Sequence, residues 1–145
     1  MKTRYDLPCN IAQTLNIIGD RWTMLILHEL LIGQHFFNDI KNNLPGLSAN
    51  VLSTRLRSLE EEGLVEVQLY QNHPPRYAYY LTELGLSLSD IFNAMIIWGS
   101  KRKPCYKELV DQDTGEAVEI AYISKTSHKI ASAVIARPIA SSHDN

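Results

Sequence analysis

Apolar residues recur at helical spacing through most of the first hundred positions of the chain. Residues 9–18 predict a first helix, which Gly19 and Asp20 end. Residues 21–32 are apolar on nearly every side, and this pattern is typical of a helix that is buried all round. We therefore expect a second helix at the centre of the core, ended by Gly33.

A short helix, a tight turn and a capped helix follow. Residues 36–44 have helical spacing, and the Pro-Gly pair at 45–46 predicts a tight turn. Ser48 is a favourable N-cap for a helix over residues 48–62, and Gly63 is a favourable residue to follow its last turn. Three leucines form one stripe of this helix, and the opposite side carries Asn50, Ser53, Thr54 and Arg57.

The hydrophobic period then changes from helical to alternating. Residues 65–71 alternate between apolar and polar positions, and residues 77–82 (YAYYLT) form a second extended run. The segment NHPPR separates the two runs. This pattern predicts a β-hairpin with an extended, proline-containing tip.

Thr82 is the expected N-cap of one long helix that reaches residue 103 and ends at Pro104. Ten positions between 84 and 98 are apolar, which is more than one core-facing side of a helix can hold. The surplus indicates a two-fold dimer interface, although the tail could instead cover this surface within one chain. The expected dimer-interface residues are Leu88, Ile91, Phe92, Met95 and Trp98.

The last 42 residues have a weaker pattern. Residues 107–123 predict a hairpin that turns at 113–115, residues 129–138 predict a third strand, and residues 141–145 predict a frayed end. The expected fold is therefore mainly α with a β-hairpin wing. A winged helix-turn-helix domain would cover residues 1–103, and a small C-terminal β-rich appendage would cover residues 104–145.

A helix-turn-helix followed by a β-hairpin places its second helix in the major groove of DNA. Short polar side chains allow a close approach, and Arg57 can fork onto a guanine or neutralise a phosphate. Any surface helix can show a polar side, so the prediction depends on the whole succession through the hairpin. The candidate DNA-binding residues are Lys41, Ser48, Ala49, Asn50, Ser53, Thr54, Arg57 and, at the hairpin tip, Arg76.

The charge of the chain limits the kind of nucleic-acid binder that it can be. The net charge is −2, which excludes a strongly basic nucleic-acid binder but not a local basic face. Residues 1–103 hold ten basic and ten acidic residues, whereas residues 104–145 hold four and six. There is no apolar run long enough for a transmembrane helix, and the N-terminus lacks the apolar stretch of a signal peptide. We expect a cytoplasmic, nucleoid-associated protein with no membrane partner.

Two cysteines are too few for a disulfide framework or a cysteine-rich zinc site. Cys9 is expected at the start of a helix, where amide groups and the helix dipole favour the reactive thiolate, and Lys2 and Arg4 are near it in sequence. The alternative is a small buried hydrophobe. If the long helix forms the dimer interface, Cys105 could approach the partner's Cys9 and form a disulfide on oxidation.

Several segments together resemble the HxlR family of bacterial winged-helix regulators, which are relatives of the MarR group. They are Cys9, IIGDRWTMLILHELLIG, FNDIKNNLPGLSANVLSTRLRSLEEEGLVE, PPRYAYYLTELG and the Trp98–Gly99 pair, and they span residues 8–100. The resemblance implies a dimeric DNA-binding transcription regulator of neighbouring genes. It also implies that a cysteine at the position of Cys9 responds to electrophiles or oxidants. Val67 departs from the arginine that family members often carry, which removes one phosphate contact.

We therefore expect a homodimeric transcriptional repressor that binds a palindromic DNA operator and responds to thiol oxidation, an electrophile or another small-molecule effector. A winged helix used only for protein–protein contacts is the main alternative, because the charges of residues 1–103 balance. The sequence predicts no enzyme, because it has no glycine-rich phosphate loop and no nucleophile–base pattern. It predicts no cofactor and no metal, because its histidines lack metal-binding spacing.

Overall fold

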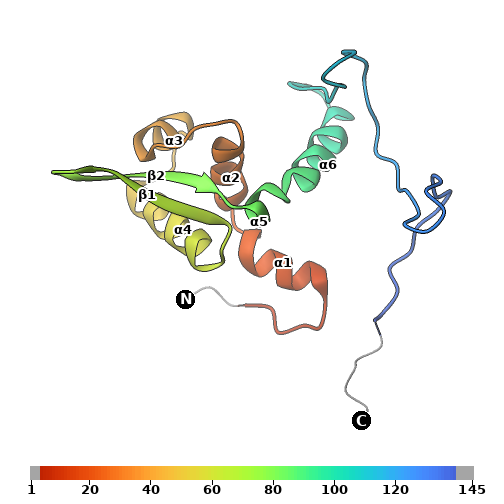
Figure 1. Ribbon diagram of the computed structural model, residues 1–145, viewed down its shortest axis with the longest axis horizontal. Coiled ribbons are helices and arrows are strands. Elements are labelled where there is room, and N and C mark those ends of the chain that lie inside the picture. Colours follow the sequence, from red (N-terminus) through yellow and green to blue (C-terminus); the bar gives the residue numbers. More distant parts are fainter. Residues whose placement is uncertain (1–3, 140–145) are drawn as a thin grey trace, which may run out of the picture. The chain divides into compact units, whose positions relative to one another are not determined.

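The computed structural model describes residues 4–139, and the predicted helix-turn-helix and hairpin are present in the predicted order (Figure 1). The elements are α1 (Asn10–Ile18), α2 (Thr23–Leu31), α3 (Phe37–Asn43), α4 (Ala49–Glu61), β1 (Val65–Asn72), β2 (Pro75–Leu81), α5 (Glu83–Leu86) and α6 (Ser89–Ser100). Helices α3 and α4 form the helix-turn-helix, and β1 and β2 form an antiparallel hairpin, which we call the wing. The prediction of a winged helix-turn-helix is confirmed.

The chain divides into two compact units, Met1–Phe92 and Asn93–Asn145, so the division falls inside α6. The first unit contains the whole helix-turn-helix and the wing. The separate role of residues 104–145 stays a prediction.

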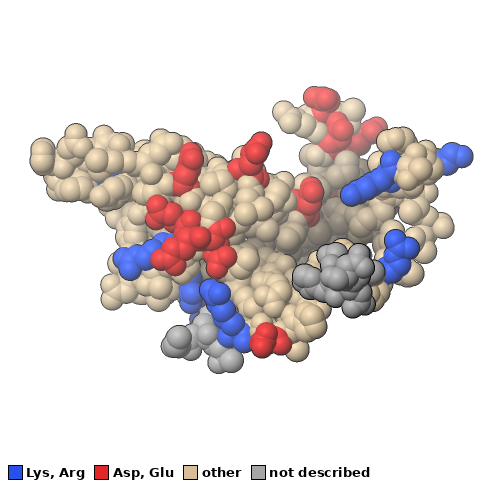
Figure 2. Space-filling model, turned by 60° about the horizontal axis from the view of Figure 1, so that its bottom comes forward, with Lys and Arg blue, Asp and Glu red and all other residues tan. Residues whose placement is uncertain are grey.

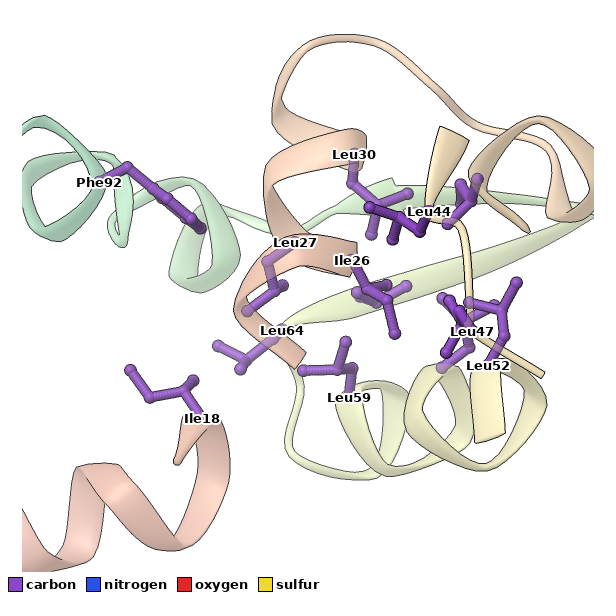
Figure 3. Close-up of a cluster of buried hydrophobic side chains, with 13 residues drawn as sticks. Ile18, Ile26, Leu27, Leu30, Leu44, Leu47, Leu52, Leu59, Leu64 and Phe92 are labelled. Atoms are coloured by element: carbon purple, nitrogen blue, oxygen red, sulfur yellow. The ribbon is translucent and has the colours of Figure 1, made fainter. Parts of the chain in front are cut away.

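The core of the first unit is built on the leucine stripe of α4. Leu52, Leu56 and Leu59 are almost completely buried, as the sequence predicts. They belong to one hydrophobic cluster with Ile26 and Leu27 of α2. Figure 3 shows Leu59 of α4 beside these two side chains, between the two helices. This packing turns the leucine side of α4 inward and leaves its polar side at the surface.

The predicted ends of α4 are confirmed by their hydrogen bonds. The Ser48 hydroxyl accepts a hydrogen bond from the Val51 amide at 3.2 Å, which satisfies one of the first unpaired amides of the helix. At the other end Gly63 has a φ of +73°, a conformation that favours glycine. The Leu64 amide then donates to the Leu59 carbonyl at 2.9 Å and closes the last turn.

The wing is longer and its turn is tighter than the sequence suggests. Pairing begins with Val65 opposite Leu81 and continues to Asn72 opposite Pro75, with one irregularity between Leu69 and Gln71. Only two residues lie between the strands, so the extended five-residue tip was wrong. In Figure 1 the strands run between α3 and α4, and the hairpin end extends beyond both helices.

The single long helix expected after Thr82 is also wrong, because the segment forms two helices, α5 and α6. Thr82 does cap α5: its hydroxyl accepts from the Gly85 amide at 3.1 Å and donates to the Gly63 carbonyl at 2.6 Å. The Ser87 hydroxyl donates to the Leu84 carbonyl at 2.6 Å where α5 ends. Because apolar residues continue through the break, their pattern does not reveal it.

Helix α2 is central to the core but is not buried all round. Ile26 and Leu27 are fully buried, whereas Leu25 and Ile32 are 45% and 53% exposed. The helix packs against α3 and β2 and shares the core cluster with α4, and one of its sides stays uncovered among the described residues. The prediction of complete burial was therefore wrong for that side.

The second unit forms isolated bridges where strands were expected. Val110 pairs with Ala117 around the predicted turn at 113–115, and Ile123 pairs with Ile130. No regular strand is assigned in residues 101–139. The Asp111 carboxylate accepts from the Thr114 and Asp113 amides at 2.8 and 2.9 Å, and these hydrogen bonds lower its pKa. The predicted frayed end, residues 141–145, lies outside the described residues.

Candidate nucleic-acid interface

The outer face of α4, which we define as Asn50, Ser53, Thr54 and Arg57, is exposed along its length. Ser48 and Ala49 are exposed at its start. The structure thus brings six of the eight predicted DNA-binding residues onto one helix. Of the other two, Arg76 is exposed on the wing at its tip end, and Lys41 is half-buried on α3.

Hydrogen bonds within α4 limit what two of these side chains can offer a ligand. The Thr54 hydroxyl donates to the Asn50 carbonyl at 2.8 Å, so it presents an acceptor oxygen and a methyl group. The Ser48 oxygen accepts from the Val51 amide as the N-cap, and its proton is left to donate. Both arrangements are compatible with contacts to DNA phosphates or bases.

The inner side of α4 holds a charged group whose role the sequence did not reveal. Arg55 forms an ion pair with Asp20 of the α1–α2 connection, with 3.3 Å between Nε and Oδ1. The Asp20 carboxylate also accepts from the Trp22 and Thr23 amides at 2.9 and 3.0 Å and from the Thr23 hydroxyl. Asp20 therefore joins the start of α2 to the side of α4.

Arg55 lies four positions before Leu59 and three after Leu52, at the edge of the leucine stripe. This spacing was the available signal that the side chain points toward the protein. Arg57 lies two positions further along the helix and on the other side. The two arginines of one helix therefore have different surroundings.

The pKa of the Asp20 carboxyl is lowered from its usual value. Burial alone would raise the pKa, because it disfavours the charged form. The hydrogen bonds from the Thr23 hydroxyl and the Trp22 and Thr23 amides, together with the Arg55 charge, outweigh burial. The carboxylate is thus held in its charged form by its partners.

A groove of about 400 Å³ runs between α4 and the wing. We call it the α4–wing groove. It is lined by Ser53, Leu56, Arg57, Glu60, Val67, Leu69, Tyr77 and Tyr79. Burial chiefly raises the pKa of the Tyr79 phenol, and the negative charge of Glu60 raises it further.

The charge of the surface is mixed. On the face drawn in Figure 2, acidic and basic side chains are interleaved. Arg4 lies 3.4 Å from a carboxylate oxygen of Glu62, beyond the last turn of α4. The positive charge that could bind a polyanion such as DNA is therefore confined to single residues. On α4 and the wing, the exposed basic residues are Arg57 and Arg76.

The predicted dimer-interface residues divide into exposed and buried ones. Ile91, Met95 and Trp98 are 38%, 53% and 63% exposed. Leu88 is partly buried against the core, and Phe92 is buried within it. The ring centroids of Phe92 and His28 are 5.9 Å apart, so this side chain packs in the chain's own core, and its part in a partner contact stays a prediction. Exposed Ile11 and Leu15 on α1 were not predicted.

Both cysteines are exposed in this chain, and whether Cys9 is a sensor stays a prediction. Cys9 is the N-cap residue of α1, but its side chain makes no capping hydrogen bond. Arg4 pairs with Glu62, and Lys2 lies outside the described residues. The Cys105 thiol donates to the Lys107 carbonyl at 3.4 Å.

Within residues 4–139, no helix has the length and apolar character needed to cross a membrane. The same part of the chain contains no group of three or more metal-binding side chains.

Comparison with known proteins identifies relatives of the helix-turn-helix and the wing. Residues 17–106 match the family described as HxlR-like helix-turn-helix. The uncharacterised HTH-type transcriptional regulator YdeP of Bacillus subtilis is 34% identical over 104 residues, which are 72% of this chain and 78% of YdeP.

Two solved structures are similar. The crystal structure of PA1607 has a TM-score of 0.73 at 27% identity and covers 92% of this chain and 97% of its own. The redox regulator HypR in its oxidised form has a TM-score of 0.60 at 32% identity, with coverage of 66% and 98%.

Proposed function

We propose, from the premise that this chain belongs to the HxlR-like helix-turn-helix family of transcriptional regulators, that it represses transcription by binding operator DNA as a homodimer. Such a regulator is not an enzyme. The observation that carries the proposal is the exposed outer face of α4, which is held outward by the buried leucine stripe beside the wing. A helix presented in this way fits the major groove, where base edges can be read.

The exposed apolar residues of α6 are the observation that supports the proposed dimer. Ile91, Met95 and Trp98 form an apolar set that a monomer would leave in water, and burial in a two-fold interface would remove it. Two copies of α4 roughly 34 Å apart would then match half-sites one helical turn apart. A palindromic operator is the corresponding DNA partner.

Thiol control is the second part of the proposal. Cys9 is exposed at the start of α1, Cys105 is exposed as well, and HypR, which is 32% identical, is a redox regulator. Oxidation would join Cys9 of one protomer to Cys105 of its partner. Each disulfide releases two protons and two electrons, and an added diazene such as diamide takes them up as the hydrazine.

A gel shift on the DNA upstream of the protein's own gene tests both parts. The wild type and Cys9→Ser are compared with and without diamide, and non-reducing gels report any linked dimer. We expect wild-type binding that diamide abolishes and Cys9→Ser binding that diamide leaves unchanged. Binding that ignores diamide would remove the thiol switch and keep the regulator. Absence of salt-sensitive binding to any duplex would favour the protein–protein role instead.

A further inference from the structure

The α4–wing groove lies where a strand of DNA must pass if α4 enters the major groove. The sugar–phosphate backbones form the walls of the major groove, and the wing packs against α4, with the α4–wing groove between them. A helix inside the groove and a hairpin outside it therefore have one backbone between them. The α4–wing groove is the space that the structure provides for that backbone.

We infer that the α4–wing groove holds one sugar–phosphate strand of duplex DNA, and that Tyr77 is a DNA-binding residue that donates its hydroxyl to a phosphate opposite Arg57. This inference depends on the proposed DNA-binding function and adds a residue and a contact type to it.

The wing side of the groove has no charged side chain. Val67 is paired with Tyr79 across the hairpin, and Leu69 is paired with Tyr77, so these four side chains share one face. Leu69 and Tyr77 are about half exposed. The apolar side chains suit the C–H faces of deoxyribose, and the two phenol hydroxyls are the polar side-chain groups on this face.

The polar side chains of the groove differ between the base of the wing and its tip, with the acidic Glu60 at the base. Glu60 lies three positions before the Gly63 turn that joins α4 to β1, so its carboxylate is at the base of the wing. Ser53 lies seven positions earlier on α4, about 10 Å further from the base along the helix axis. Tyr77 and its partner Leu69 are likewise further from the base than Tyr79.

This difference along the groove favours a phosphate near the tip of the wing rather than at its base. The Glu60 charge that raises the pKa of Tyr79 would repel a phosphate at the base of the groove. Toward the tip, Arg57 provides charge, and Ser53 and Tyr77 provide neutral donors. Tyr77, which lies further from Glu60 along the groove than Tyr79, is therefore the wing's donor to the phosphate.

The test compares Tyr77→Phe with Tyr70→Phe as a matched control. Tyr70 is on the same hairpin and is 52% exposed, against 47% for Tyr77, but it does not line the α4–wing groove. The ring of Tyr70 contacts Phe36, with centroids 5.2 Å apart. Affinities of the full-length proteins are measured by fluorescence anisotropy on the upstream duplex and on a duplex of arbitrary sequence.

Loss of a phosphate contact weakens binding to all duplexes alike, because phosphates carry no sequence information. We expect Tyr77→Phe to lose about tenfold in affinity per bound protomer, by the same factor on both duplexes. The slope of log affinity against log salt should stay as in wild type, because a neutral donor releases no counterion. Tyr70→Phe should bind like wild type.

Wild-type affinity in Tyr77→Phe would overturn the inference without touching the proposed function. A loss confined to the upstream duplex would do the same, because it would indicate a base contact. An equal loss in Tyr70→Phe would overturn it too, since the effect would then belong to the whole wing. If the wild-type protein binds neither duplex, the proposed function itself fails.

Discussion

The two sides of α4 differ more than the sequence of the helix suggests. On the inner side, the leucine stripe and the Arg55–Asp20 ion pair attach the helix to the rest of the unit. On the outer face, Arg57 and the short polar residues are exposed. Arg55 and Arg57 are the same residue type two positions apart, yet one is part of the scaffold and the other is available to a ligand. Surroundings, rather than residue type, decide what each arginine does.

The comparison predicts that substitutions on the inner side act on stability, and that substitutions on the outer face act on DNA affinity. The largest expected effect is that of Leu56→Ala. Leu56 is 1% exposed, and truncating a fully buried leucine removes apolar contacts and leaves a cavity. We expect the free energy of unfolding to fall by about 2–5 kcal/mol in urea denaturation. A loss below about 1 kcal/mol would show that the leucine stripe does not hold α4.

Asp20→Ala is expected to have the next largest effect. It removes the N-terminal capping interactions of α2 and leaves Arg55 without its carboxylate partner. The expected loss is about 2 kcal/mol in the same urea measurement. Asp39→Ala is the matched control, because Asp39 is exposed in the first turn of α3 and should cost about 0.5 kcal/mol. Equal losses for both variants would contradict the scaffold role of Asp20.

The lowered pKa of Asp20 makes the stabilisation from its hydrogen bonds and its ion pair depend on pH. The usual value is 3.8, and the folded value is lower, so Asp20 stabilises the fold above the usual value. That stabilisation is lost as the pH falls through the folded pKa. Urea denaturation at about pH 5 and about pH 3 should show a smaller loss of stability in Asp20→Asn than in wild type. The same loss in both proteins would mean that Asp20 does not contribute.

Ser48→Ala is expected to have a smaller effect than the inner-side variants. The substitution removes the acceptor for the Val51 amide at the start of α4 and should cost about 1 kcal/mol. Ser53→Ala, in the second turn of the helix on the outer face, is the control and should change stability by less than about 0.5 kcal/mol. A larger loss for Ser53→Ala would contradict the division between the two sides.

The helix-turn-helix and the wing could be predicted from the sequence because their signals are local. The leucine spacing, the Ser48 cap, Gly63 and the change to alternating residues each act within a few positions. The break after α5 could not be predicted, because apolar residues continue through it and the Ser87 hydrogen bond is visible only in the structure. The ion pair joins positions 20 and 55, and helical spacing alone does not identify such a distant partner.

The candidate site could be predicted only in part, because only some of its residues follow from local signals in the sequence. The outer face of α4 follows from the wheel of one helix, and its exposure matches the prediction. Tyr77 belongs to the α4–wing groove only because the register places it opposite Leu69 and beside α4. The burial of Phe92 in the chain's own core could not be predicted, because an apolar pattern does not distinguish burial in one chain from burial against a second chain.

The measurement that tests the account most directly is the salt dependence of DNA affinity for wild type and Arg57→Gln, with the unfolding free energy of both. Arg57 is exposed, so stability should change by less than about 0.5 kcal/mol. We predict weaker DNA binding in the variant and a slope of log affinity against log salt that is smaller by about one per bound protomer. Unchanged affinity and slope in a stable Arg57→Gln protein would contradict the claim that the outer face of α4 binds DNA.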